Sequence, residues 1–371
     1  MLKCLLGVLF ALLVIAEGPR PASAIPLFAH QYGVTCGKCH SVIPHLNEFG
    51  AAFLANGERI PGVQPGPAFP VSGKVNLVDS SQNQGSGPDG AGLPKALVDE
   101  IELFTAGAIG ARASYLVEQY VVDGGEPGEI RDAWINDRLN PWTARIPVFV
   151  QGGSFTLPLP VDPETFRDTY QSYTPYAQTV GANPFNFFDP KMGMRLQFGD
   201  TLRGLSLQLF AGPGYDRESE LPKTGVDTML DAQDAMGQFT LSAFHYDGLR
   251  LLGGTIPDRF ERTGYGLTYG QWSRFSSEFV LISGWDSNCA APGHTGCSSS
   301  GGFEQLRYAL TRRLFAEARY EGTNDPSGFT RDAVVLLGYG PSENSRAPVE
   351  DVITHSPLTN NTMNAQFSVA Y

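Results

Sequence analysis

From residue 71 to the end of the chain, apolar and polar residues alternate in segments of about ten residues, and this pattern limits the fold more than any other feature. In "GQFTLSAFHY", Phe239, Leu241 and Ala243 fall on one face of a strand. A period of two is typical of β-strands that have two different faces. No stretch after residue 24 contains 18 consecutive apolar residues, which argues against a protein that crosses a membrane with helices.

The alternating segments predict a transmembrane antiparallel β-barrel of about sixteen strands, an even number like that of single-chain bacterial barrels. Segments of about ten residues suit tilted strands that cross a bilayer. The segment at 346–355 is the weakest, and a barrel of fourteen strands stays open as an alternative. The predicted strands cover 71–79, 96–107, 110–121, 129–139, 145–156, 190–199, 203–213, 236–247, 248–256, 262–271, 274–286, 302–311, 312–323, 330–340, 346–355 and 362–371.

The connections between these segments differ in length. Short turns are predicted at "GDTLRG" and "YDGLR", whereas the long connections are 80–95, 214–235 and 287–301. Outer-membrane barrels have short periplasmic turns and longer extracellular loops. A soluble β-sandwich would also show alternation and turns, but the final aromatic strand, which ends on Tyr371, favours the membrane barrel.

One stretch, 157–190, is rich in Pro, Tyr and Phe and does not alternate. We expect it to be a loop with one helical turn around 164–170, folded into the barrel lumen.

Residues 1–24 have the features of a secretory signal peptide. Lys3 precedes the apolar run 5–16, and Ala22-Ser23-Ala24 forms a cleavage site. Export would place the mature chain, from residue 25, at the bacterial outer membrane in contact with lipid. The formal net charge of −12 for the full chain makes nucleic acid an unsuitable partner, because its phosphates require Lys and Arg.

Export also exposes the remaining cysteines to an oxidising compartment. Cys289 and Cys297 enclose "AAPGHTG" and are expected to form a loop disulfide, with a metal pair around His294 as the alternative. A compact acidic group in "YDRESELP" could attract cations, although a solvated loop explains it as well. Its members are Asp216, Glu218 and Glu220.

Residues 25–60 differ from the rest of the chain. After Pro44, the apolar residues Leu46, Phe49, Phe53 and Leu54 share one face of a short helix, and Asn56-Gly57 ends it. The proline and glycine residues of 61–70, "PGVQPGPAFP", predict a linker. The barrel is predicted to cover 71–371.

The most specific motif is Cys36-Gly-Lys-Cys39-His40. This spacing is typical of a covalently attached c-type haem, in which two thiols bond to the vinyl groups and the histidine ligates the iron. A disulfide alone gives His40 no role, a thioredoxin-type pair needs a βαβ context, and a zinc site needs four ligands. We therefore expect one haem c held by Cys36 and Cys39, with His40 as the proximal ligand.

The second axial ligand is less constrained. The N-terminal region of the mature chain contains no methionine. His45 is five residues after His40, and if both lie on one short helix it cannot reach the opposite face of the same haem. His30 is the better candidate, although an ordinary polar residue explains it equally well. A distant ligand such as His245 or Met192 and a five-coordinate iron stay open.

A segment of about 40 residues cannot bury a haem by itself. A barrel of sixteen strands has a lumen that is wide enough to hold more than side chains. We therefore expect the haem segment to lie in the lumen or at its mouth.

These residues resemble the N-terminal haem segment of the fused monohaem cytochrome–porins of bacterial outer membranes. The resemblance covers about 35 residues and is fairly specific, and "GGSFTLPLPVDPETFRDT" is more loosely similar to a stretch of that family's barrel. It is carried by Phe28-Ala29-His30-Gln31, Cys36 to His40, Pro44-His45-Leu46-Asn47-Glu48-Phe49-Gly50 and Asn56-Gly57. His30 and His45 depart from the family's usual residues.

The resemblance implies an outer-membrane electron conduit, of the Fe(II):cytochrome c oxidoreductase type. Extracellular Fe(II) or another donor would reduce the haem, and a periplasmic cytochrome or other carrier would accept the electron. Two other functions are consistent with the same residues. One is a porin-type diffusion channel in which the haem segment is a plug or sensor, and the other is a haem enzyme that acts on a small oxidant such as peroxide.

Overall fold

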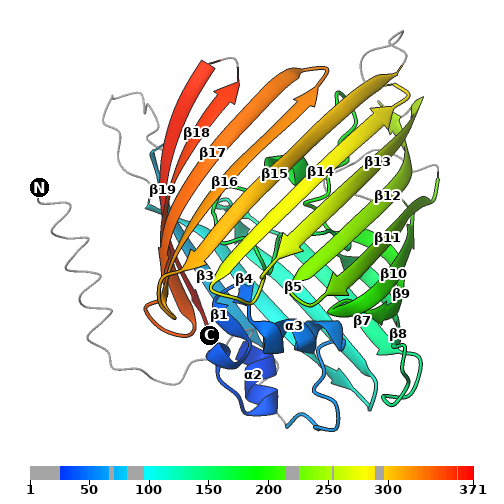
Figure 1. The fold of residues 1–371 in the computed structure, drawn as a ribbon, viewed down its shortest axis with the longest axis vertical. Coiled ribbons are helices and arrows are strands. Elements are labelled where there is room, and N and C mark those ends of the chain that lie inside the picture. Colours follow the sequence, from blue (N-terminus) through cyan, green and yellow to red (C-terminus); the bar gives the residue numbers. More distant parts are fainter. Residues whose placement is uncertain are drawn as a thin grey trace, which may run out of the picture.

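The computed structural model describes residues 26–66, 71–81, 96–213, 225–252, 255–288, 296–356 and 358–371. Within them, sixteen antiparallel strands form a closed barrel, and a small N-terminal segment covers one end of it (Figure 1). The two-residue strand β6 (Glu126–Pro127) extends the β5–β7 hairpin. The barrel strands are β3 (Ser72–Ser80), β4 (Ala96–Ile109), β5 (Ala113–Asp123), β7 (Ile130–Arg138), β8 (Val148–Phe155), β9 (Lys191–Asp200), β10 (Arg203–Gly212), β11 (Asp227–Met236), β12 (Phe239–Leu252), β13 (Ile256–Tyr269), β14 (Phe275–Asp286), β15 (Cys297–Ala309), β16 (Leu314–Asp325), β17 (Gly328–Tyr339), β18 (Ser345–Ser356) and β19 (Leu358–Ala370).

The barrel closes where its last strand pairs with its first. Phe367 of β19 lies opposite Leu77 of β3, and Val369 lies opposite Val75. Closure pairs the backbone groups that an open sheet would leave at its edges. The prediction of a closed barrel with sixteen strands is confirmed.

The two faces of the wall are inverted relative to a soluble protein. On β17, Val335 and Leu337 point outward and are 62% and 54% exposed. On the neighbouring β16, Glu317, Arg319 and Glu321 point inward and are buried. An apolar exterior around a polar interior is the pattern of barrels that face lipid, and it indicates a protein of the bacterial outer membrane. The helices in the described part of the chain are not long and apolar enough to cross a membrane.

The two ends of the barrel carry different connections. The chain ends at Tyr371 on the rim that also carries the short connections 110–112, 201–202, 237–238 and 310–313. The connections longer than nine residues all join strands at the opposite rim; they are 81–95, 156–190, 213–226 and 287–296. Long loops mark the extracellular end of an outer-membrane barrel, so the rim with Tyr371 is the periplasmic one. The N-terminal segment lies at this end, beside the C-terminus (Figure 1).

The predicted strand boundaries contain two errors that offset each other in the count. The sequence predicts a turn in "YDGLR", but β12 runs through Asp247 and Gly248 without a break. A Cβ on Gly248 would lie 2.4 Å from Cζ of Phe260, so this glycine makes room for a ring from the neighbouring strand. The loop predicted over 214–235 is also wrong at its end, because β11 begins at Asp227. The aspartates of β11 that face inward interrupt the apolar alternation, so the sequence pattern does not predict a strand there.

The long loop between β8 and β9, residues 156–190 and here called the lumen loop, folds into the barrel as predicted. Phe185 packs on Tyr246 and Phe260 of the wall, with ring centroids 4.5 and 4.8 Å apart. The helical turn expected around 164–170 lies slightly earlier, where the Phe166 N–H donates to the Asp162 carbonyl at 3.1 Å. The loop's one short helix among the described residues is α4 (Thr174–Ala177). The apolar cluster that fills this part of the lumen joins Leu157, Leu159, Val161, Phe166, Tyr173, Tyr176, Phe185 and Phe187 to wall residues such as Phe210, Phe244 and Phe303.

Candidate functional site

The N-terminal segment, residues 26–66, is built from short elements around the Cys-x-x-Cys-His motif. They are α2 (Pro26–Tyr32), the 3-10 turn η1 (Cys36–Lys38), β1 (His40–Val42), β2 (His45–Leu46) and α3 (Glu48–Ala55). Asn47 caps α3, because its side chain accepts a hydrogen bond from the Gly50 backbone N–H at 3.0 Å. The same side chain donates to the Lys38 carbonyl at 3.2 Å. One residue thus fixes the start of α3 to the motif.

Gly50 allows α3 to lie directly on the motif. A Cβ at this position would lie 2.1 Å from the carbonyl oxygen of Cys39. The backbone N–H of Asn47 donates to that same carbonyl at 2.8 Å. The close approach of helix and motif therefore requires glycine here.

His40 is oriented by a hydrogen bond from its ring. Nδ1 lies 2.8 Å from the carbonyl oxygen of Pro44. A carbonyl only accepts, so Nδ1 carries the proton and Nε2 of the neutral ring keeps its lone pair. Burial lowers the pKa of His40 to about 4, which keeps the ring neutral. A hydrogen bond of this kind, from one ring nitrogen to a backbone carbonyl, is usual for a histidine that ligates a metal through its other nitrogen.

The two cysteines have different surroundings. Cys39 is a free thiol at the wall of a cavity, whereas Cys36 is fully buried against Ile43 and Ala370. Burial raises the pKa of Cys36 to about 12, and the Glu343 carboxylate adds to this effect. Burial also raises the pKa of Cys39. Both thiols are therefore protonated at neutral pH, unlike the low-pKa thiolate of a reactive redox pair.

The cavity beside the motif has a volume of about 1130 Å³. Ligand pockets in proteins are commonly about 300–1,000 Å³. The cavity lies between the N-terminal segment and the barrel wall, and Cys39 and His40 both line it. Apolar walls come from Phe28, Tyr32, Leu46, Phe49, Phe53 and Leu54 of the segment, and from Leu116, Trp134 and Phe149 of the barrel.

The residues around the cavity fit a covalent c-type haem in three respects. His40 offers a neutral nitrogen, Cys39 offers a thiol at the wall, and aromatic and aliphatic side chains provide the apolar cover that a haem needs. Cys36 lies behind the wall rather than on it. It packs on Ile43 and Ala370, which both line the cavity, so it lies directly behind the wall.

The candidate distal ligands do not line the cavity. His30 is exposed on α2 and is not one of the lining residues. Met192 of β9 is exposed, and the His245 side chain of β12 is 43% exposed. In the part of the chain that the structure describes, His40 is the one histidine at the cavity wall, and methionine is absent from that wall.

His45 faces away from the cavity, toward the lumen loop. Its Nε2 lies 3.2 Å from the carbonyl oxygen of Gln271, and its Nδ1 lies 3.6 Å from Oδ2 of Asp168. That carboxylate is held by Arg307 at 2.5 Å. Burial is the main cause that lowers the pKa of His45 to about 4. His45 therefore fastens the segment to the barrel. His40 and His45 lie in the paired strands β1 and β2 rather than on one helix.

The N-terminal segment is attached around much of the periplasmic rim. Its contacts are the Gln31 side chain with Ala106 of β4 at 3.0 Å, the Gly37 N–H with Glu343 between β17 and β18 at 3.2 Å, and His45 with Gln271 between β13 and β14 at 3.2 Å. Attachment to three separate parts of the rim makes the segment a cover over the mouth rather than a loosely tethered domain.

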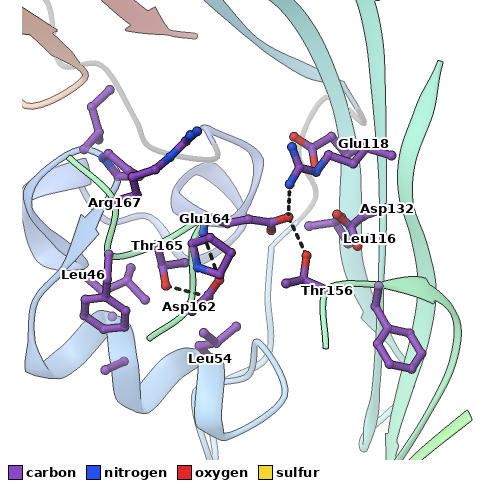
Figure 2. Close-up of a pocket in the computed structure, with 18 of the residues that line it drawn as sticks. Leu46, Leu54, Leu116, Glu118, Asp132, Thr156, Asp162, Glu164, Thr165 and Arg167 are labelled. Carbon is purple, nitrogen blue, oxygen red and sulfur yellow. Dashed lines mark hydrogen bonds and ion pairs between the residues drawn. The ribbon is translucent and has the colours of Figure 1, made fainter. Parts of the chain in front are cut away.

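Charged residues on the far side of the cavity are not predicted by the sequence analysis. Glu118 of β5, Asp132 of β7 and Glu164 of the lumen loop, here called the carboxylate cluster, all line the cavity (Figure 2). Arg131 forms an ion pair with Glu164 at 3.2 Å. Inward positions on the two strands could have revealed Glu118 and Asp132, but the sequence does not show where the loop places Glu164.

Three sequence predictions lie partly or wholly outside the described residues. Cys297 at the start of β15 is disulfide-bonded, whereas Cys289 is not among the described residues, so the pairing stays a prediction. The acidic group Asp216, Glu218 and Glu220 and the signal peptide over 1–24 also lie outside them.

The chain matches no protein-family model and no curated protein. Among solved structures it is similar to OmpF of Salmonella typhi in complex with daunomycin, with a TM-score of 0.57, 13% sequence identity, and coverage of 81% of this chain and 97% of that chain. The anion-selective porin from Comamonas acidovorans gives a TM-score of 0.56 and 10% identity, over 81% and 98% of the two chains. The outer-membrane channel DcaP of Acinetobacter baumannii gives 0.54 and 11%, over 81% and 96%. At sequence identities this low, the structural similarity shows a porin-type barrel fold and no finer property.

Proposed function

We propose that this porin-type barrel carries one covalent haem c at its periplasmic mouth and transfers electrons across the outer membrane. Residues 25–60 would form the haem segment, 61–70 the linker and 71–371 the barrel. The observation that carries the proposal is the Nδ1–H of His40, which donates to the Pro44 carbonyl and leaves Nε2 available at the wall of a large cavity. Cys36 and Cys39 would hold the haem, and His40 would be its proximal ligand.

A bound haem would supply one-electron chemistry, with iron cycling between its ferric and ferrous states. The chain's own residues would bury that group and limit access to it. The apolar walls exclude water on the segment side, and the lumen loop fills the barrel on the other side. The position at the periplasmic end supports a periplasmic cytochrome or similar carrier as one partner. The donor on the outer side would be Fe(II) or another extracellular reductant.

A diffusion channel is the second candidate, and the structural comparisons favour it for the barrel itself. The similar structures are porins and an outer-membrane channel. The segment across the mouth and the apolar cluster in the lumen oppose free diffusion through this chain. In that function the haem segment would be a plug or sensor.

The test is an anaerobic visible spectrum of the purified, detergent-solubilised protein before and after addition of Fe(II). We expect a covalent haem that survives denaturation and is reduced by Fe(II). The double variant C36S/C39S should lack the covalent haem, and Ser41→Ala, a matched change beside the motif, should keep it. A protein with no covalent haem would contradict the proposal. A haem that only dithionite reduces would exclude Fe(II) as the donor.

A further inference from the structure

The carboxylate cluster brings together three acidic side chains from three different elements. One oxygen from each of Glu118, Asp132 and Glu164 lies within 4.8 Å of the others. Glu118 and Asp132 come from paired strands, and the lumen loop places Glu164 against them (Figure 2). Unscreened carboxylates at this distance repel one another strongly away from bulk water.

A second observation points to a ligand for this cluster. Asp132 is only 3% exposed, and within the described part of the chain its Oδ2 has no hydrogen-bond partner. A buried charged acceptor that is left without a partner is unfavourable, because it has lost its water and gained nothing in return. In native proteins, a buried polar atom without a hydrogen-bond partner usually marks the place of a water, proton or ion.

The nearby groups do not complete the cluster. Glu164 is held by Thr156, whose hydroxyl donates at 2.6 Å, and by Arg131 at 3.2 Å, and both contacts are to Oε1. Arg131 compensates one of the three negative charges. Asp162 is close enough to add further negative charge. When all three carboxylates are ionised, two negative charges remain after Arg131, which matches the charge of a divalent cation.

We propose that the carboxylate cluster binds a divalent cation of the class that prefers oxygen ligands, such as Ca²⁺, Mg²⁺ or Mn²⁺. Three carboxylates with no sulfur or nitrogen donor among them suit this class. The cluster lines the cavity, so water can occupy the remaining coordination positions. The ion joins the lumen loop to the barrel wall, and the site does not depend on whether a haem is attached.

The probe is Mn²⁺, followed by electron paramagnetic resonance, on the purified full-length protein after treatment with a chelator. We expect the wild-type protein to bind one Mn²⁺ that excess Ca²⁺ or Mg²⁺ displaces. Asp132→Asn keeps the shape of the side chain and removes its charge, and it should weaken binding at least tenfold. Glu164→Gln should have the same effect, and because it lies outside the barrel strands it provides the test if the Asp132 variant does not fold.

The matched control is Asp247→Asn on the outer face of the barrel. Asp247 belongs to another acidic group, with His245 and Glu261, in which all three ligand atoms also lie close together. This variant should bind Mn²⁺ like the wild type. Wild-type protein that binds no Mn²⁺, or binding that persists in both cluster variants, would overturn the proposal. Binding that disappears only in the Asp247 variant would place the ion on the outer face instead.

Discussion

Glu58 illustrates how single residues fix the N-terminal segment to the barrel. It follows Gly57 at the end of α3, and its φ of 54° lies in the left-handed region that L-residues rarely adopt. Its buried carboxyl accepts a hydrogen bond from the Ser114 hydroxyl of β5 at 3.0 Å. Burial is the main cause that raises the pKa of Glu58 to about 7 from its usual 4.5. The folded segment thus holds a proton that the undocked segment releases.

This proton predicts a specific pH dependence. The raised pKa means that Glu58 favours the docked state below about pH 4.5, and that this contribution is lost as the pH rises toward 7. Relative to wild type, Glu58→Gln should therefore stabilise docking at pH 8, by up to roughly 3 kcal/mol, and have little effect at pH 4.5. Hydrogen exchange of the α3 amides measures the difference.

His40 and His45 titrate in the opposite direction, because their lowered pKa values favour the docked state as the pH rises from about 4 to 6.5. Wild type and Glu58→Gln both contain the two histidines, so the contribution of these residues cancels in the difference between the two proteins. A difference between Glu58→Gln and wild type that does not change with pH would show that Glu58 is ionised in the docked segment.

The residues at the cavity wall also predict whether the iron of a bound haem would have a sixth ligand from the protein. Apart from His40, the described lining contains no histidine or methionine. We therefore expect the reduced protein to bind carbon monoxide readily, with a shift of its visible spectrum. The comparison is His30→Ala, which should bind carbon monoxide as the wild type does. If carbon monoxide binds to His30→Ala but not to the wild type, His30 is the sixth ligand of the iron.

At the scale of strands, the boundaries depend on which side chains meet across the wall. β12 continues through Asp247-Gly248 because Phe260 on β13 occupies the space above the glycine. A glycine in the sequence predicts a turn in both of two cases. It can adopt a backbone conformation that the turn requires, or it can leave space for a neighbouring side chain. Only the neighbouring strand distinguishes these two cases.

We expect Gly248→Ala to destabilise the barrel by about 1–3 kcal/mol, the usual cost of overpacking. The added Cβ would lie 2.4 Å from Cζ of Phe260. Gly152→Ala on β8 is the control, because nothing lies within 4 Å of its added Cβ. Denaturant unfolding in detergent micelles measures both. Equal effects of the two substitutions would mean that Phe260 moves aside without cost.

At the scale of the whole molecule, the barrel is filled rather than open. The lumen loop builds an apolar cluster inside the wall, and the N-terminal segment covers the periplasmic mouth. Hydrogen bonds from three separate parts of the rim hold that cover. Among the described residues, the porin-type wall therefore surrounds an apolar cluster and a covered mouth.

This arrangement predicts a low ion conductance. In planar bilayers, the intact protein should carry at least tenfold less current per molecule than OmpF of Salmonella typhi measured under the same conditions. The reason is that apolar side chains and a docked segment occupy the path that ions would take. A conductance comparable to that of OmpF would favour the diffusion channel over the electron conduit.

The sequence alone determined the barrel and the motif residues, because two-residue periodicity and Cys-x-x-Cys-His spacing are local properties of the chain. The ends of β11 and β12, the burial of Cys36 and the exposure of His30 depended on tertiary contacts. So did the carboxylate cluster, whose three residues lie on two strands and a loop. Such groups meet only after the barrel closes and the lumen loop folds inward, and a local pattern carries no information about residues brought together by that closure.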